Sequence, residues 1–203
     1  MIAIYRAAWE IHRFLTRHKI PYAIIGGIAV QKWGFPRVTV DVDLTVRAPL
    51  EAGSHDFVEL VLTKFRPRYF DPFVSARTRQ LILISASNGR DIDISFGVPL
   101  YENEFLRRAV NFVLERGKVV RVCSAEDLII HKCVAGRPQD ARDVDGVIAR
   151  QRESLDTKYI RKWLRFFDGL LPEAGALQRF ERAWRAEKRA AREARQSYQT
   201  RRK

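Results

Sequence analysis

Cysteine is scarce in this chain of 203 residues, which contains only Cys123 and Cys133. Their spacing matches no zinc-binding pattern, and two cysteines exclude a disulfide-rich scaffold, so we expect a protein of the reducing cytoplasm. Long apolar runs are also missing. The longest run, over residues 22–30, contains two glycines and is far shorter than the ~20 residues that cross a bilayer. Both absences favour a soluble, cytoplasmic protein.

We expect no signal peptide, and the sequence shows no internal repeat and no low-complexity linker. Arg6 and Glu10 interrupt the apolar residues near the N-terminus, and no small-residue cleavage site follows them. Hydrophobic residues make up 46% of the chain, which suffices for one core, or for one core and a smaller helical lobe. We therefore expect one or two domains.

Acidic residues are outnumbered, with 24 Asp and Glu against 37 Lys and Arg, which gives a net charge of +13. This excess points to a polyanionic partner, either nucleic acid or an anionic membrane surface. Residues 174–203 carry ten Lys or Arg and three Glu, or +7, so the other 173 residues carry +6. The basic charge is thus concentrated at the C-terminal end.

The C-terminal segment has the periodicity of a basic amphipathic helix over residues 174–195. Residues 177–184 include large apolar side chains and suit a helix docked on the core. After Arg185 the apolar side is mainly alanine, which lacks anchors for a membrane but suits a projecting helix that binds phosphate backbones. Both interpretations stay open. The candidate RNA-binding residues are Arg185, Arg189, Arg192 and Arg195.

Hydrophobic periodicity predicts an α/β (α+β) fold. Helical spacing covers residues 3–17, 28–33, 55–65, 104–115, 138–150 and 157–167. A segment similar to a capping box, Ser124-Ala-Glu-Asp127, predicts another helix that carries His131 and Lys132. Strand patterns cover residues 22–25, 38–46, 81–85, 91–96 and 118–122, with a hairpin turn at Asn88-Gly89. We expect an α/β domain with a small mixed sheet over residues 1–122, a helical lobe over residues 123–203, and the active site between them.

Two carboxylates leave one face of the strand predicted over residues 38–46. Asp41 and Asp43 alternate there with apolar residues, and neighbouring carboxylates repel each other unless a cation lies between them. Mg²⁺ suits that position because it binds carboxylate and phosphate oxygens at ~2.1 Å. Taken alone, however, Asp-Val-Asp is more typical of a solvated polar face than of a metal site.

Three neighbouring features favour the metal site. Gly26 and Gly27 lie between a predicted strand and a predicted helix, where backbone N–H groups can approach a phosphate. Asp93, on a later strand, can complete a triad of carboxylates. Arg37 and Thr39 precede the first acids and can bind an anionic substrate. Each feature has a plainer alternative. Gly26-Gly27 would be only a turn, Asp93 an ordinary polar residue of a half-exposed hairpin, and Arg37 and Thr39 residues on the solvent-facing side of the strand.

Together these residues resemble the signature of the nucleotidyltransferase fold superfamily, the DNA polymerase β-like group. That signature is Gly-Gly or Gly-Ser, a short helix, Asp-x-Asp on a strand and a third Asp on another strand. Here it reads Gly26-Gly27, thirteen residues, Asp41-Val-Asp43 and Asp93. The stretch from Gly26 to Leu44 resembles the AbiEii-type branch in particular, which comprises toxin-like nucleotidyltransferases of toxin–antitoxin and phage-defence systems.

That branch also has a later helix with a Lys and a downstream Arg-Asp pair, which the stretch from Ser124 to Asp143 resembles. The resemblance implies that Lys132 neutralises the triphosphate, and the alternative is a lysine on a helix surface. Asp140 and Asp143 would support Lys132 or Arg142, or they would form surface ion pairs.

The resemblance also implies the cofactors and substrate. Two Mg²⁺ (or Mn²⁺) ions would bracket the α-phosphate of an NTP, held by Asp41, Asp43 and Asp93. Asp91 shares the face of Asp93 and is the alternative third acid. We prefer Asp93 because the residues that follow it, up to Gly97, resemble the family's pattern at the strand end.

The expected function is transfer of a nucleoside monophosphate to an RNA hydroxyl, such as the 3′ end of a tRNA, because the charge of the chain suits RNA. A second interpretation keeps the chemistry but makes the acceptor a protein hydroxyl, as in adenylylating toxins or antitoxins, with an antitoxin protein as partner. A third is a catalytically silent module that binds nucleic acid or a partner protein. The three intact acids, Asp41, Asp43 and Asp93, argue against the third.

Overall fold

The computed structural model of the protein describes residues 2–47 and 53–200, except for the side chains of residues 195 and 197–200. The chain divides into two compact units. The first consists of Met1–Lys32 and Arg37–Ser124, and the second consists of Trp33–Pro36 and Ala125–Lys203. In the described part of the chain, no helix is both long and apolar enough to span a bilayer.

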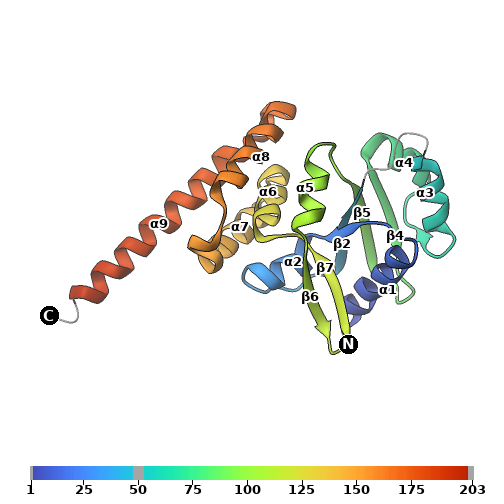
Figure 1. The fold of residues 1–203 in the computed structure, drawn as a ribbon, viewed down its shortest axis with the longest axis horizontal. Coiled ribbons are helices and arrows are strands. Elements are labelled where there is room, and N and C mark those ends of the chain that lie inside the picture. Colours follow the sequence, from blue (N-terminus) through green and yellow to red (C-terminus); the bar gives the residue numbers. More distant parts are fainter. Residues whose placement is uncertain (1, 48–52, 201–203) are drawn as a thin grey trace. The chain divides into compact units, whose positions relative to one another are not determined.

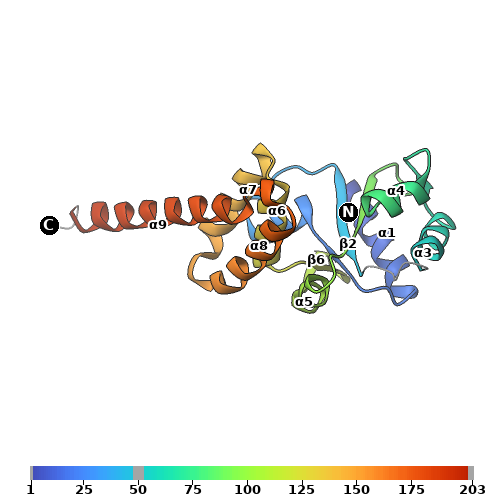
Figure 2. The same ribbon diagram turned by 90° about the horizontal axis from the view of Figure 1, so that it is seen from above.

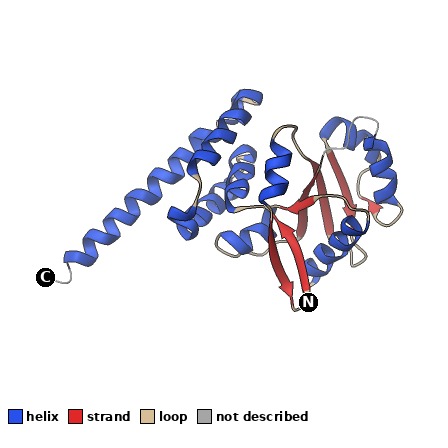
Figure 3. Cartoon of the chain, viewed as in Figure 1, coloured by secondary structure: helices blue, strands red, loops and turns tan. Residues whose placement is uncertain are grey.

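The first unit is built on a seven-stranded mixed sheet with the order β3-β4-β5-β2-β1-β7-β6 (Figures 1 and 3). The parallel pairs are β2 with β5 and β1 with β7, and the other neighbours are antiparallel. The strands are β1 (Tyr22–Ile24), β2 (Asp41–Val46), β3 (Arg66–Pro67), β4 (Leu81–Ser85), β5 (Asp91–Phe96), β6 (Val110–Glu115) and β7 (Lys118–Val122).

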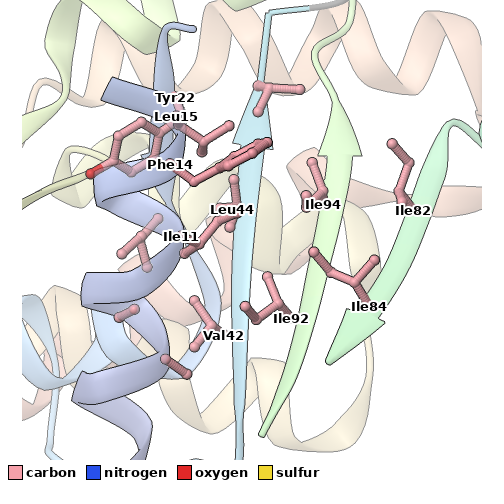
Figure 4. Close-up of a cluster of buried hydrophobic side chains, with 14 of the residues drawn as sticks. Ile11, Phe14, Leu15, Tyr22, Val42, Leu44, Ile82, Ile84, Ile92 and Ile94 are labelled. Carbon is pink, nitrogen blue, oxygen red and sulfur yellow. The ribbon is translucent and has the colours of Figure 1, made fainter. Parts of the chain in front are cut away.

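Apolar residues that alternate along β2 and β5 form the core with helix α1. Figure 4 shows Ile11 and Leu15 of α1 facing Val42 of β2 and Ile92 of β5, and all four side chains are fully buried. Because side chains alternate along a strand, the intervening residues of β2 and β5 lie on the opposite face of the sheet. The helices of this unit are α1 (Ala3–Arg17), α2 (Gly26–Trp33), α3 (Gly53–Leu62), α4 (Pro72–Arg79) and α5 (Tyr101–Arg108).

The second unit is helical and ends in a long helix. Its α-helices are α6 (Ala125–Ala135), α7 (Pro138–Gln151), α8 (Thr157–Leu170) and α9 (Ala176–Thr200). The Asp168 carboxylate begins α9 by accepting hydrogen bonds from the N–H groups of Ala176 (2.7 Å) and Leu177 (3.0 Å). Phe180 and Trp184 are buried and hold the first half of α9 against this unit. Figures 1 and 2 show α9 continuing past the other helices of the unit.

The fold class expected from the sequence is confirmed, and three predicted elements are wrong in part. The strand predicted from residue 38 begins only at Asp41, and Val38 and Val40 are 85% and 61% exposed. The cause is the register, because β5 begins at Asp91 opposite Asp41 and offers no partner to earlier residues. The helix predicted over residues 104–115 ends at Arg108, and the residues after it form β6.

Strand β6 exists because it forms a hairpin with β7. Phe112 pairs with Val120, and Gly117 occupies the turn with a φ of +74°. This pairing lets Val110 and Phe112 pack on the core. Helix α2 also begins at Gly26, two residues earlier than the helix predicted over residues 28–33, so Gly26 and Gly27 form its first turn. Elements α4 and β3 were not predicted.

Candidate active site

Four aspartates lie together on the face of the sheet opposite α1. Strands β2 and β5 are parallel neighbours, and their register pairs Asp41 with Asp91 and Asp43 with Asp93. All four are half-buried, and they alternate with fully buried apolar residues. Neighbouring strands lie about 4.8 Å apart, so this register concentrates up to four negative charges on a small area. Sequence reasoning singled out these acids, and the structure adds their pairing.

Gly26 and Gly27 bring the start of α2 against this carboxylate face. Gly26 has a φ of +60°, and a Cβ atom built there would lie 2.0 Å from Oδ2 of Asp43. A Cβ atom at Gly27 would lie 2.3 Å from Oγ1 of Thr39. Only glycine therefore fits at either position without displacing Asp43 or Thr39. The start of α2, with the positive end of its helix dipole, lies beside Asp43, in an arrangement that suits a phosphate.

Thr39 and Arg37 differ in how they relate to the acids. Thr39 Oγ1 donates a 3.0 Å hydrogen bond to Oδ1 of Asp41, which orients that carboxylate. Arg37 is half-buried, and its guanidinium donates to the carbonyl of Val38 (3.3 Å). The structure thus brings Thr39 into the carboxylate cluster and places Arg37 on the loop that leads to it.

Arg68, which sequence reasoning missed, is the cation paired with β5. Its Nη1 lies 3.1 Å from Oδ2 of Asp91, and its Nη2 donates to Oδ1 of Asp93. The backbone N–H of Arg68 donates to the carbonyl of Leu83 (2.9 Å), and Nε donates to the carbonyl of Ile84 (3.1 Å). No local pattern identifies Arg68, because it follows a strand of only two residues and meets the acids through the order of the strands.

The electrostatics of Asp93 reflect this crowding. Burial is the main cause that raises the pKa of Asp93 above its ordinary value. The charge of Arg68 lowers the pKa, and the negative charges of Asp41 and Asp91 raise it again. The balance is a raised pKa, so one arginine does not offset burial and two like charges. A cation bound at this face would relieve that imbalance.

In the second unit, Lys132 belongs to a buried and balanced charge cluster. Its Nζ lies 2.7 Å from Oδ1 of Asp140 and 2.9 Å from Oδ2 of Asp143. All three residues are less than 9% exposed. Arg137 completes the cluster from the surface, because its side chain is 76% exposed and its Nε lies 3.0 Å from Oδ2 of Asp140. Arg142, also proposed from the sequence, is exposed and forms no ion pair with the described residues.

The candidate RNA-binding residues lie on the exposed part of α9. Arg185, Arg189 and Arg192 are exposed, and the part of the chain that the structure describes gives them no ion-pair partner. The side chain of Arg195 lies outside the described residues. This part of α9 therefore presents free positive charge.

A further group of metal-type ligands lies on α3. Within the described residues, only His55, Asp56 and Glu59 place three such ligand atoms all within 4.8 Å of one another. All three are exposed, so water competes with any ion there. The acids of β2 and β5 do not meet this spacing, and Arg68 binds two of them.

Comparison with known proteins identifies the fold of the chain. No protein-family model matches the chain, and no curated protein matches its sequence. A solved structure does match, that of an antigenic nucleotidyltransferase-like protein from Paracoccidioides brasiliensis. The two share 16% sequence identity over 86% of this chain and 92% of that chain, with a TM-score of 0.50. This chain has a nucleotidyltransferase fold.

Two other solved structures with this fold match less closely in TM-score. One is the antibiotic-resistance factor ANT(2'')-Ia, with 16% identity over 96% of this chain and 97% of that chain and a TM-score of 0.46. The other is the lincosamide antibiotic adenylyltransferase LnuA, with 12% identity over 70% and 94% and a TM-score of 0.47. At these identities the likeness concerns the nucleotidyltransferase fold alone, so the resemblance to the AbiEii-type branch stays a prediction.

Proposed function

We propose that this protein is a metal-dependent nucleotidyltransferase, which moves a nucleoside monophosphate from an NTP to a hydroxyl acceptor. The observation that carries the proposal is the register of β2 and β5, which sets Asp43 beside Asp93 while Asp43 also packs on Gly26 at the start of α2. Carboxylates and helix N–H groups are thereby within reach of one phosphate-sized ligand.

The donor set fits a hard divalent ion. Asp41, Asp43 and Asp93 offer carboxylate oxygens on one face, as Mg²⁺ or Mn²⁺ requires, and we assign two ions to them with Asp91 as the alternative third acid. Bound there, the ions supply charge neutralisation at the phosphate and at the attacking and leaving oxygens. Thr39 keeps Asp41 oriented through its hydrogen bond.

The start of α2 is the proposed site of the triphosphate. The N–H groups at Gly26 and Gly27 bind phosphate oxygens where side chains would block them. Arg37, on the loop before β2, is a candidate for the same anion. Both carboxylates around Lys132 already neutralise it, so we assign Lys132, Asp140 and Asp143 a positioning role in the second unit.

We favour RNA as the acceptor, and the exposed arginines of α9 are the reason. Arg185, Arg189 and Arg192 recur every three to four residues, are exposed and form no close ion pair with the described residues, so they are able to bind phosphates. A toxin-like role with an antitoxin partner rests on the AbiEii-type resemblance alone.

The test is a labelling experiment. The protein is incubated with each labelled NTP and Mg²⁺ or Mn²⁺, with total RNA or with RNA-depleted cell extract, and with EDTA or Asp43→Asn as controls. Label on RNA supports the proposal in full. Label on protein supports nucleotidyl transfer but shows that the acceptor is a protein hydroxyl and not RNA. If no NTP labels either fraction, the proposed function is wrong.

A further inference from the structure

Arg68 is held in place by its own strand region as well as by the acids. Its backbone N–H and its Nε are bound to the carbonyls of Leu83 and Ile84, which belong to β4. Leu83 pairs in register with Asp93 on β5. The guanidinium is therefore aimed across β4 at the carboxylate face of β5, and its remaining two nitrogens bind Asp91 and Asp93.

Arg68 occupies one carboxylate oxygen of Asp93, the acid that the proposed function assigns to the metal. Oδ1 of Asp93 accepts from Nη2 of Arg68, whereas the proposed function requires Asp93 as a metal ligand. A guanidinium and a divalent ion both seek carboxylate oxygens, and their like charges exclude close approach. Side-chain exposures of 27% for Arg68 and 29% for Asp93 leave the pair partly shielded from water, which strengthens this competition.

We propose that Arg68 is a built-in counter-cation of the carboxylate face, which the metal must displace from Asp93. The inference rests on the proposed function for the identity of the incoming cation. Arg68 stabilises the metal-free protein by offsetting the repulsion among the aspartates, and it sets the metal concentration at which the site fills.

Asp91 can keep the guanidinium of Arg68 bound after it leaves Asp93. Its side chain is 47% exposed and its contact with Arg68 uses the other nitrogen, Nη1. Arg68 can therefore release Asp93 and keep Asp91, with the anchors at Leu83 and Ile84 unchanged. Arg68 is then a positioning residue that gives the two acids of β5 different roles. It neutralises Asp91 and leaves Asp93 to bind the metal.

Metal binding without nucleotide tests this directly. Mn²⁺ is titrated into the full-length protein in ~0.15 M salt, where surface charges are screened beyond ~8 Å, and free Mn²⁺ is measured by electron paramagnetic resonance. Arg68→Gln is expected to bind Mn²⁺ about threefold to tenfold more tightly than wild type, because the competing ion pairs are gone. Arg68→Lys keeps the positive charge but loses the planar guanidinium, so its Mn²⁺ affinity should lie between those of wild type and Arg68→Gln.

Arg66→Gln is the matched control. Arg66 lies two residues before Arg68, on the edge strand β3, is exposed, and its ladder partner is Ser85 rather than an acid. It removes the same unit of charge without touching the aspartates, so its Mn²⁺ affinity should stay within about twofold of wild type. An equal gain in Arg66→Gln and Arg68→Gln would overturn the inference, since the effect would then be general charge.

Thermal unfolding provides the second readout. Without metal, Arg68→Gln should melt at a lower temperature than wild type, and Mn²⁺ should raise its melting temperature by more than it raises that of wild type. Unchanged or weaker Mn²⁺ binding in Arg68→Gln and Arg68→Lys, with binding by wild type intact, overturns the inference and leaves the proposed function standing. If neither wild type nor any variant binds Mn²⁺ without nucleotide, the inference fails, and the labelling experiment decides the proposed function separately.

Discussion

The carboxylate face of β2 and β5 and the Lys132 cluster of the second unit use the same residue types with opposite balance. On the sheet, four half-buried aspartates share one face, and Arg68 pairs with two of them. In the second unit, Asp140 and Asp143 meet Lys132 and Arg137. An excess of partly exposed carboxylates favours binding of a further cation, whereas buried carboxylates that are already matched by two cations do not. Stoichiometry and exposure thus separate a candidate metal site from a structural one.

The largest expected effect comes from the sheet. Asp43→Asn should lower the rate of nucleotide transfer by a factor of ~10³ or more, because loss of a shared metal ligand removes several kcal/mol of transition-state stabilisation. Its free energy of unfolding should be unchanged or higher, since repulsion among the acids falls. Single-turnover rates and urea unfolding measure the two quantities. Asp41→Asn should behave alike, and a wild-type rate in either variant would end the assignment.

The two acids of β5 should differ although they share a face. Asp93→Asn is expected to match the loss in Asp43→Asn, while Asp91→Asn should lower the rate only mildly, because Arg68 takes Asp91 as its partner. The comparison is made at saturating metal and NTP. The reverse order of the two rates would show that Asp91 is the third acid.

The Lys132 cluster should respond in stability. Lys132→Met leaves Asp140 and Asp143 buried without their shared cation, which should cost about 3–5 kcal/mol in the free energy of unfolding. Arg142 is exposed on α7, the helix that carries Asp140 and Asp143, and Arg142→Gln should change the free energy of unfolding by less than about 0.5 kcal/mol. Should Lys132→Met keep its stability and raise the KM for NTP instead, Lys132 binds the triphosphate, and the contrast between the two clusters disappears.

The parts predicted from the sequence were those set by local pattern. Asn88-Gly89 predicts the β4–β5 hairpin because the turn needs a left-handed residue, and Gly89 has a φ of +76°. The spacing of the acids predicts that they share one face. These features involve neighbours in sequence, so one chain suffices to find them.

The parts that failed depend on partners far along the chain. Val38 alternates like a strand residue but lacks a ladder partner, because β5 begins at Asp91. Residues 110–115 contain enough spaced apolar side chains to resemble a helix, and pairing with β7 decides otherwise. Arg68 reaches Asp93, 25 residues away, only because β3, β4 and β5 are adjacent in the sheet. Single-sequence periodicity contains none of this information.

The exposed arginines of α9 are a third group of charges, which form no close ion pair with the described residues. Deleting residues 185–203 should raise the KM for RNA and leave the KM for NTP nearly unchanged, because exposed arginines bind phosphates without shaping the triphosphate site. Wild-type affinity for single-stranded RNA should fall with salt with a slope of about −0.7 per phosphate contacted, and the deletion should flatten that slope. The deletion keeps Phe180 and Trp184, which are buried. Unchanged RNA binding with a lower melting temperature would identify α9 as a structural brace.

The smallest expected effect concerns His131, beside Lys132 on α6. Burial, and then the charge of Lys132, lower the pKa of His131 to about 4. Its Nε2 is closed off from solvent, so burial disfavours the protonated ring. The unfolded chain binds the proton near pH 6.5 and the folded chain only near pH 4, so the free energy of unfolding falls as the pH is lowered between these values.

The contribution of His131 to that slope is at most about 1.4 kcal/mol per pH unit. Replacing His131 by Gln should remove it, so the variant should lose less stability than wild type when urea unfolding is compared at pH 6.5 and pH 4.5. His18→Gln, the same substitution at an exposed histidine of the first unit, is measured beside it. If His131→Gln leaves the slope unchanged, the pKa of His131 is not lowered by folding, and burial of this ring does not contribute to the pH dependence.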